Sequence, residues 1–276
     1  MVDCHIHMVL DGVDWREAIY RHSVCTDITW VEKTIAQYAK LGYTYLRDGG
    51  DMWGVGAYAK TVAAQHGIVY KTPLAPLSKK GHYGGFIGLQ WGSLQEFAHL
   101  VYLQKKQGCD FCKIMVSGLM DFDRYGVLTE DPLPAQEMRA LVHIAHEEGL
   151  AVMAHCNGAE AIYACADAGA DSIEHGAYPN EECLAVMVEA ETVWVPTLST
   201  IGNLRGKGRY DENAVCRIFE TMSENVVTFA RMGGLVACGS DAGAWAVAHG
   251  CDSERRYLED LGIDWETGSA VIQEKF

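Results

Sequence analysis

Short apolar runs alternate along the whole chain with longer segments in which apolar residues recur at helical spacing. Several of the short runs are closed by a turn that contains glycine, a pattern that predicts a buried strand. The predicted strands are residues 2–7, 44–48, 68–73, 111–117, 151–155, 171–175, 192–197 and 235–240. The predicted helices lie near residues 14–41, 56–66, 93–106, 134–148, 159–168, 181–189, 211–232 and 253–273. Strict alternation predicts parallel strands joined by right-handed crossovers.

Eight strand–helix units in 276 residues predict an α/β protein whose sheet closes into a (β/α)₈ TIM barrel. A doubly wound open sheet is the alternative that the same alternation allows. No linker or shift of composition divides the chain, so we expect residues 1–276 to form a single domain. Apolar residues make up 49% of the sequence, which is enough to bury a large core.

The net charge and the positions of the cysteines indicate which partners and which cellular compartment to expect. The chain has 22 Lys and Arg against 37 Asp and Glu, and this net charge of −15 argues against nucleic acid or an anionic membrane as partner. It opens on a strand-like segment without the pattern of a signal peptide, and no apolar run is long enough to span a membrane. Most of the ten cysteines lie in apolar segments, which predicts free thiols in the cytoplasm.

Residues that can bind a metal close several of the predicted strands. His5 and His7 alternate in Asp-Cys-His-Ile-His, so both imidazoles point to one face of the first strand. His155, His175 and Asp241 close later strands, each before a turn that contains glycine. The C-terminal ends of barrel strands meet at one mouth, where barrel enzymes keep their active sites. Four imidazoles and a carboxylate suit Zn²⁺, Fe²⁺ or Mn²⁺.

Lys113, in Cys-Lys-Ile-Met-Val-Ser-Gly, falls in the fourth barrel strand. An ammonium group repels a metal cation, so a protonated lysine does not belong in such a site. A neutral lysine can react with carbon dioxide, and the carbamate that results is an anion with two oxygens that can bridge two metals. The alternative is a lysine that extends to solvent.

This order of residues resembles the amidohydrolase superfamily in its two-metal form, with His-x-His first, then lysine, two histidines and an aspartate. The strings Leu-Gly-Tyr-Thr-Tyr-Leu-Arg-Asp-Gly-Gly, Lys-Ile-Met-Val-Ser-Gly and Ser-Ile-Glu-His-Gly are similar to one branch of that superfamily. The branch contains metal-dependent dipeptidases (prolidases) and imidazolonepropionase-like proteins. The resemblance covers essentially the whole chain.

The resemblance implies two divalent metal ions, with Zn²⁺ favoured over Mn²⁺ or Fe²⁺, held by His5, His7, Lys113, His155, His175 and Asp241. Carboxylated Lys113 would bridge the ions. Asp241 would also act as general base toward a metal-bridging hydroxide. The implied activity is hydrolysis of an amide or peptide-like C–N bond in a small-molecule substrate. His82, in Lys-Gly-His-Tyr-Gly-Gly, matches a histidine that hydrogen-bonds the substrate carbonyl in relatives.

The chain departs from the family pattern in two places. Relatives usually carry a small β-sandwich, whereas here the first predicted strand begins at residue 2. We therefore expect a barrel that lacks most or all of the sandwich, by nature or by trimming, and whose bare surface favours a homo-oligomer. Asn157 stands near the fifth-strand histidine, where dipeptidase-like relatives often have a tyrosine that holds a substrate carboxylate.

Other functions are compatible with the same residues. A lactone or ester hydrolase would use identical machinery, and a mononuclear deaminase would use fewer of the ligands. A catalytically silent barrel that binds a metabolite is the alternative outside enzymes, but it gives no reason for six ligands to be present.

Five further side chains are candidates for structural or pocket-lining roles. We expect Arg47 and Asp48 to form an internal ion pair. We expect His249 either to line the pocket or to lie in solvent. Tyr125 and Trp245 either line the pocket or pack against it.

Overall fold

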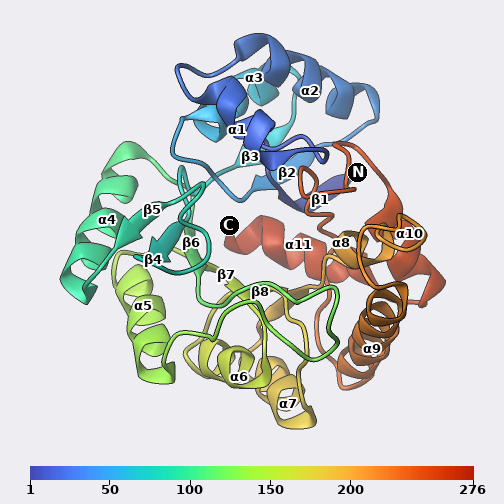
Figure 1. Ribbon diagram of the computed structural model, residues 1–276. Helices are drawn as coiled ribbons and strands as arrows, with labels where there is room; N and C mark the ends of the chain where they lie inside the picture. The colour runs from blue at the N-terminus through green and yellow to red at the C-terminus, as the bar shows by residue number, and fades with distance from the viewer.

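The strands form a parallel ring inside a ring of helices, as Figure 1 shows. The computed structural model describes residues 1–276. The first half contains β1 (Val2–Ile6), α1 (Trp15–His22), α2 (Ile28–Lys40), β2 (Tyr45–Asp48), α3 (Val55–Gln65), β3 (Val69–Lys71), β4 (Leu77–Lys79), β5 (Leu89–Trp91), α4 (Leu94–Gln107) and β6 (Cys112–Met115). The second half contains α5 (Ala135–Glu147), β7 (Val152–Cys156), α6 (Ala159–Asp167), β8 (Ser172–His175), α7 (Glu181–Glu189), β9 (Val193–Val195), α8 (Ser199–Gly202), α9 (Glu212–Arg231), α10 (Ser253–Asp260) and α11 (Trp265–Lys275).

Two parallel sheets, β1-β2-β3 and β5-β4-β6-β7-β8-β9, are joined into one barrel by backbone contacts at both seams. At the first seam, β3 pairs with β2 and β4 pairs with β6, so β3 and β4 are two parts of one barrel strand. At the second seam, residues 235–242 run between β9 and β1. The Trp194 N–H donates to the Leu235 carbonyl at 2.9 Å, and the Cys4 N–H donates to the Cys238 carbonyl at 2.8 Å. The predicted TIM barrel is confirmed.

Several details of the predicted elements are wrong. The last predicted helix, near residues 253–273, is the two helices α10 and α11. The third strand continues beyond residue 73 as β4, after a break that contains Pro73 and Pro76, because proline has no N–H for a strand ladder. The glycine-rich residues 80–92 include a short additional strand, β5. The helical segment near residues 14–41 is two helices, since Asp27 caps α2 at a new start.

The eighth predicted strand, residues 235–240, forms isolated bridges rather than a continuous ladder. Gly239 explains the close approach of this segment to β1. A Cβ atom at Gly239 would lie 2.8 Å from the Cβ of His5 and 2.5 Å from Val195 Cγ1. The segment therefore reaches the barrel mouth by passing against His5, which brings the following residue Asp241 to the same place.

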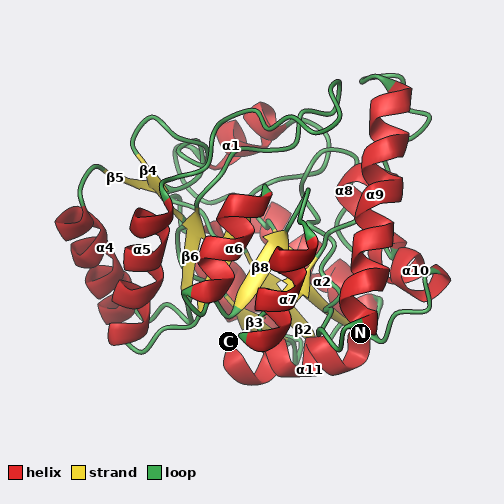
Figure 2. Cartoon of the chain, turned by 90° about the horizontal axis from the view of Figure 1, so that it is seen from below, coloured by secondary structure: helices red, strands yellow, loops and turns green.

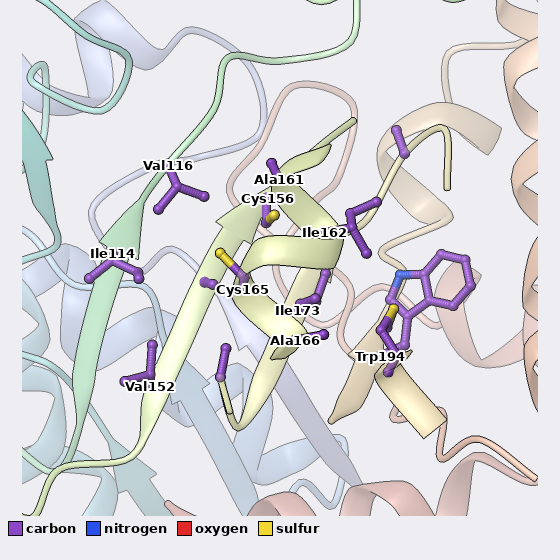
Figure 3. Close-up of a cluster of buried hydrophobic side chains, with 14 of the residues drawn as sticks. Ile114, Val116, Val152, Cys156, Ala161, Ile162, Cys165, Ala166, Ile173 and Trp194 are labelled. Carbon is purple, nitrogen blue, oxygen red and sulfur yellow. The ribbon is translucent and has the colours of Figure 1, made fainter. Parts of the chain in front are cut away.

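The main core lies between the barrel strands and the helices. Figure 3 shows Ile114, Val152 and Ile173, from three neighbouring strands, on the side that faces α6, with Ile162 and Cys165 of that helix packed against them. Because successive strand residues point to opposite faces, the positions between these apolar residues point into the barrel. A register shift of one residue would exchange the two faces.

The interior positions of several strands carry polar residues. They include Arg47 on β2, Lys113 on β6, His155 on β7 and Glu174 on β8, all of them buried. The same alternation therefore produces an apolar outer face for the helices and a polar inner face for the site.

Helix α11 crosses one end of the barrel, and the loops gather at the opposite end, as Figures 1 and 2 show. Phe276, which follows α11, is buried with its ring centroid 5.2 Å from that of Phe111. The Arg47 guanidinium lies 4.3 Å from the centre of the Phe276 ring, within the range of a cation–π contact. No helix in the chain combines the length and the apolar composition that a membrane span requires.

Arg47 pairs with Glu174, at 2.8 Å, and not with Asp48. The expected Arg47–Asp48 pair is wrong because adjacent strand residues point to opposite faces. Arg47 also donates to the Cys4 carbonyl, at 2.7 Å, while Asp48 accepts from the Met8 N–H at 3.1 Å.

We predict that Phe276→Ala lowers the free energy of unfolding by about 3 kcal/mol, as for a buried phenylalanine that leaves a cavity. The loss follows from the contacts of the Phe276 ring with Arg47 and Phe111 at the barrel end. Urea unfolding followed by tryptophan fluorescence measures it. Phe276→Leu should retain most of the stability, and Val24→Ala, at a side chain 96% exposed, should change nothing. Equal stability of the alanine variant and the parent would show that α11 does not seal the barrel.

Candidate metal centre

His5, His7 and Asp241 bring three ligand atoms together at the mouth of the barrel. The Nε2 atoms of His5 and His7 are 3.3 Å apart. Asp241 Oδ1 lies 3.5 Å from His5 Nε2 and 3.3 Å from His7 Nε2. The alternation of β1 aligns the two imidazoles, and the Asp241 N–H donates to the His5 carbonyl at 2.7 Å. The seam that closes the barrel thus places the carboxylate beside both rings.

His155, His175 and Lys113 lie against this group. The ring centroids of His155 and His175 are 4.6 Å apart, and that of His5 is 5.3 Å from His175. Lys113 is buried and lines the same cavity as His7, His155 and His175. The structure therefore brings all six sequence-predicted ligands to one place.

The backbone turns sharply where two of these ligands leave their strands. His175 and Asp241 have φ values of 65° and 58°, in the left-handed region that few residues other than glycine adopt. Glu174 already takes the inward position at the end of β8. The turn at His175 lets the next side chain reach the mouth as well, and such strain is typical of functional sites.

The donor set fits divalent metal ions. Lys113 Nζ and His7 Nδ1 are buried without a hydrogen-bond partner, an arrangement that costs free energy unless another group compensates it. Burial is the main cause that lowers the pKa of His7 and His155 to about 3, so both are neutral, the form that binds a metal. Burial also lowers the pKa of Lys113 to about 8, which increases the fraction of the neutral amine that a carbamate requires.

The ligands open into a cavity of about 390 Å³. Of the six, His7, Lys113, His155, His175 and Asp241 line it, whereas His5 is fully buried beneath. Fourteen of the 24 lining residues are hydrophobic, so the ligands lie at the base of a largely apolar chamber. Such a chamber with a few convergent polar groups is typical of a site for a small molecule.

Solved structures of amidohydrolases share this architecture. A Xaa-Pro dipeptidase with bound methionine superposes with a TM-score of 0.76 at 20% identity, covering 100% of this chain and 72% of that one. Ochratoxinase of Aspergillus niger superposes with a TM-score of 0.78 at 20% identity, covering 100% of this chain and 69% of that one. The chain shares the barrel fold of these enzymes, the fold that the resemblance in its sequence implied.

Sequence comparison gives a consistent result at lower coverage. Ochratoxinase of Aspergillus niger is 26% identical over 239 residues, which are 72% of this chain and 47% of that protein. This chain thus spans about half the length of this curated relative. An uncharacterised protein of Mycobacterium bovis, Mb2939c, is 34% identical over 119 residues, 41% of this chain and 32% of that protein. No family model matches the chain.

Two side chains that orient candidate ligands in this barrel were missed by the sequence analysis. The Glu174 carboxylate lies 2.7 Å from His5 Nδ1 and also pairs with Arg47. The Thr197 hydroxyl lies 2.7 Å from His175 Nδ1. Such partners fix the ring orientation and the tautomer of metal-binding histidines. The available signal was position, because Glu174 and Thr197 close predicted strands beside the expected ligands.

His82 lies outside the ligand cluster. Its Nδ1 pairs with the Glu130 carboxylate, and its side chain is 34% exposed. The next residue, Tyr83, lines the cavity instead, with its ring centroid 4.9 Å from that of His155. Tyr83 is therefore a site residue that the sequence analysis missed, and contact of His82 with the substrate stays a prediction.

The structure shows whether Trp245, Tyr125 and His249 line the cavity. Trp245 lines the cavity, and Tyr125 is not among the lining residues. His249 is buried rather than solvated, with its Nε2 2.9 Å from the Leu10 carbonyl and its Nδ1 2.9 Å from the Tyr38 hydroxyl. It joins the loop after β1 to helix α2 and stays out of the cavity.

The side chain of Asn157 forms its hydrogen bonds within the protein. Its side-chain amide donates to the Gly118 carbonyl at 3.0 Å, and its side-chain oxygen accepts from the Ala177 N–H at 2.9 Å. Asn157 is completely buried and does not line the cavity. It therefore offers no group to a substrate.

We predict that Glu174→Gln weakens Zn²⁺ binding roughly 10- to 100-fold, the usual effect of removing the partner of a metal-binding histidine. The glutamine keeps the shape but loses the negative charge shared by His5 and Arg47. Competition with a chromophoric chelator measures the affinity.

The matched control is Glu254→Gln, which alters another buried carboxylate, one that accepts from the Ser199 hydroxyl at 2.8 Å. It should leave Zn²⁺ affinity unchanged. Equal losses in the two variants would mean that Glu174 acts only through general stability.

Proposed function

We propose that residues 1–276 form one metal-dependent hydrolase barrel that cleaves an amide or peptide-like C–N bond in a small molecule. The convergence of six potential ligands at the base of a largely apolar cavity carries this proposal. Structural neighbours named as a Xaa-Pro dipeptidase, a prolidase and an amidohydrolase support it.

The proposed metal site has two halves. His5, His7 and Asp241 would hold one divalent ion, and His155 and His175 would hold a second. A carbamate on Lys113 would supply an anionic oxygen ligand shared by the two halves. Bound ions supply Lewis acidity, which polarises the scissile carbonyl and acidifies water. Nitrogen and oxygen donors of this kind suit Zn²⁺ best, with Mn²⁺ and Fe²⁺ as alternatives.

Asp241 is the proposed general base. Its carboxylate lies at the base of the cavity beside both histidines of β1, where it can take a proton from the attacking water. The same oxygen can then deliver the proton to the departing amine, which must leave as a neutral molecule. The apolar chamber limits other water at the reacting carbon. His82 remains a proposed contact of the substrate carbonyl.

The cysteines are compatible with this function in the cytoplasm. All ten are free, and six are buried. Free thiols persist in a reducing compartment. We therefore propose that the enzyme acts there on a small molecule, without a role for the thiols in catalysis.

We predict that Asp241→Asn lowers kcat at least about 100-fold, the usual contribution of general acid–base catalysis. Asparagine offers a carbonyl oxygen as a ligand but cannot carry a proton. The measurement pairs turnover of an N-acyl amino acid with metal content by mass spectrometry, which should stay near the value of the parent. Activity close to that of the parent would assign proton transfer to another residue.

We predict that Lys113→Ala loses most activity and at least one of two bound metal ions per chain. A short carboxylic acid added to this variant should partly restore both, because it replaces an exchangeable anion in the space of the side chain. Metal content with and without the added acid provides a measurement independent of turnover. Lys113→Met, which refills the space, should not be rescued.

Full metal content in Lys113→Ala would contradict the carbamate bridge. One ion in the parent protein would favour a mononuclear site on His5, His7, His175 and Asp241. A screen of lactones and amino-heterocycles beside amides would then separate an ester hydrolase and a deaminase from the proposed amidase.

A further inference from the structure

The side chain of Asn157 joins the ends of three neighbouring strands, β6, β7 and β8. Asn157 directly follows β7 and is completely buried. Its Nδ2 donates to the carbonyl of Gly118, in the segment after β6, at 3.0 Å. Its Oδ1 accepts from the N–H of Ala177, in the segment after β8, at 2.9 Å. One amide group therefore connects both neighbours of the strand that carries it.

The backbone at this position makes further bonds to the same two segments. The Asn157 N–H donates to the Ser117 hydroxyl at 2.8 Å, and that hydroxyl donates to the Gly118 carbonyl at 3.1 Å. On the other side, the Gly158 N–H donates to the Ala177 carbonyl at 2.8 Å. The three strand ends are thus linked by both the main chain and the side chain of this short stretch.

The Gly118 carbonyl also faces a candidate ligand. Its oxygen lies 3.3 Å from Nε2 of His155. A carbonyl can only accept, so Nε2 carries the ring proton and Nδ1 keeps the free lone pair. Metal-binding histidines usually donate their second ring N–H to a carbonyl or a carboxylate in this way. The Gly118 carbonyl is therefore the group that sets the orientation and the tautomer of His155.

The peptide of Gly118 depends on hydrogen bonds for its own orientation. A Cβ atom at this position would lie 2.7 Å from Thr129 Oγ1 and 2.7 Å from the backbone N of Glu130, so there is no room for a side chain. Glycine has no side chain to pack and has wide backbone freedom. The bonds from Ser117 and Asn157 supply the constraint that a side chain would otherwise provide.

The opposite end of the Asn157 amide supports the turn at His175. His175 and Gly176 have φ values of 65° and 66°, and the next residue, Ala177, donates to Asn157. This bond fixes the chain where it leaves the left-handed turn. The rings of His155 and His175 are neighbours, with centroids 4.6 Å apart. One buried amide therefore supports the backbone on both sides of this pair of histidines.

The chemistry of the two partners explains why the residue is an asparagine. The Gly118 carbonyl needs a donor and the Ala177 N–H needs an acceptor, and an amide offers both on one short planar group. A leucine of similar size would leave the Ala177 N–H and one bond of the Gly118 carbonyl unmade in a buried place. The tyrosine that dipeptidase-like relatives often carry near this position has a single hydroxyl.

We propose that Asn157 is a positioning residue of the metal centre. It orients His155 through the Gly118 carbonyl and His175 through the Ala177 N–H, and so prepares the half of the site assigned to the second ion. This inference rests on the proposed metal site and gives Asn157 a role in assembling that site in place of contact with a substrate.

The first test follows the Nε2 proton of His155 by NMR of protein labelled with ¹⁵N-histidine, as isolated and again after loading with Zn²⁺. The signal is assigned by its loss in His155→Gln. In Asn157→Leu this proton should exchange with water roughly 10-fold faster, because the carbonyl that accepts it is less firmly held. Asn157→Ser, whose short hydroxyl cannot reach both partners, should behave alike and serves if the leucine variant does not fold.

Asn203→Leu is the matched control. Asn203 Nδ2 donates to the Ala246 carbonyl at 3.1 Å, and its Oδ1 accepts from the Tyr257 hydroxyl at 3.2 Å, so the same two groups are removed away from the ligands. Exchange at His155 should not change in this variant. Unchanged exchange in both Asn157 variants, or an equal acceleration in Asn203→Leu, would overturn the assignment.

A Zn²⁺ titration against a chromophoric chelator shows which half of the site is affected. Asn157→Leu should bind the second ion roughly 10-fold more weakly, at the lower end of the effect of removing a ligand's partner, and the first ion as the parent does. Equal weakening of both ions would indicate general loosening and overturn the proposal. A parent that binds fewer than two ions would contradict the proposed two-ion site, whereas the exchange measurement would still decide the role of Asn157.

Discussion

The buried ion pair between Arg47 and Glu174 connects the barrel interior to the candidate metal centre. Glu174 holds His5 Nδ1 at 2.7 Å, and Arg47 holds the carbonyl of Cys4, the residue before that histidine. On the other side, the guanidinium rests on Phe276 at the end that α11 covers. A buried ion pair is stable only when the remaining donors and acceptors of both side chains also form hydrogen bonds. The Ser172 hydroxyl, which accepts from Arg47 at 3.0 Å, helps to meet that requirement.

This arrangement explains how a fully buried histidine can hold a fixed orientation. A carboxylate that accepts from Nδ1 leaves Nε2 as the free nitrogen, and Nε2 is the atom that faces His7 and Asp241. The carboxylate in turn would be too costly to bury without Arg47. Stability of the barrel interior and geometry of the candidate site are therefore parts of the same network.

The sequence predicted the barrel and the placement of its six candidate ligands because both depend on local patterns. Alternation on β1 aligns His5 with His7, and the ends of parallel strands necessarily meet at one mouth. The partner of Arg47 could not be read in this way. Asp48 is adjacent in sequence, but Glu174 is distant, and only the closed barrel shows that Arg47 and Glu174 share the interior. The break between β3 and β4 likewise depends on which neighbour each half pairs with.

The positive φ values at His175 and Asp241 could not be predicted from the alternation of residues either, and they add backbone strain. A regular strand can present Glu174 or His175 to the mouth, but not both, because adjacent side chains diverge. The left-handed turn at His175 removes this restriction, and its side chain is then held by Thr197. Thr197 itself has a φ of 48°, so the partner is strained as well. Strain at successive strand ends is tolerated because the strands below are packed against the helices, and it lets one mouth carry more functional side chains than the alternation of eight regular strands would supply.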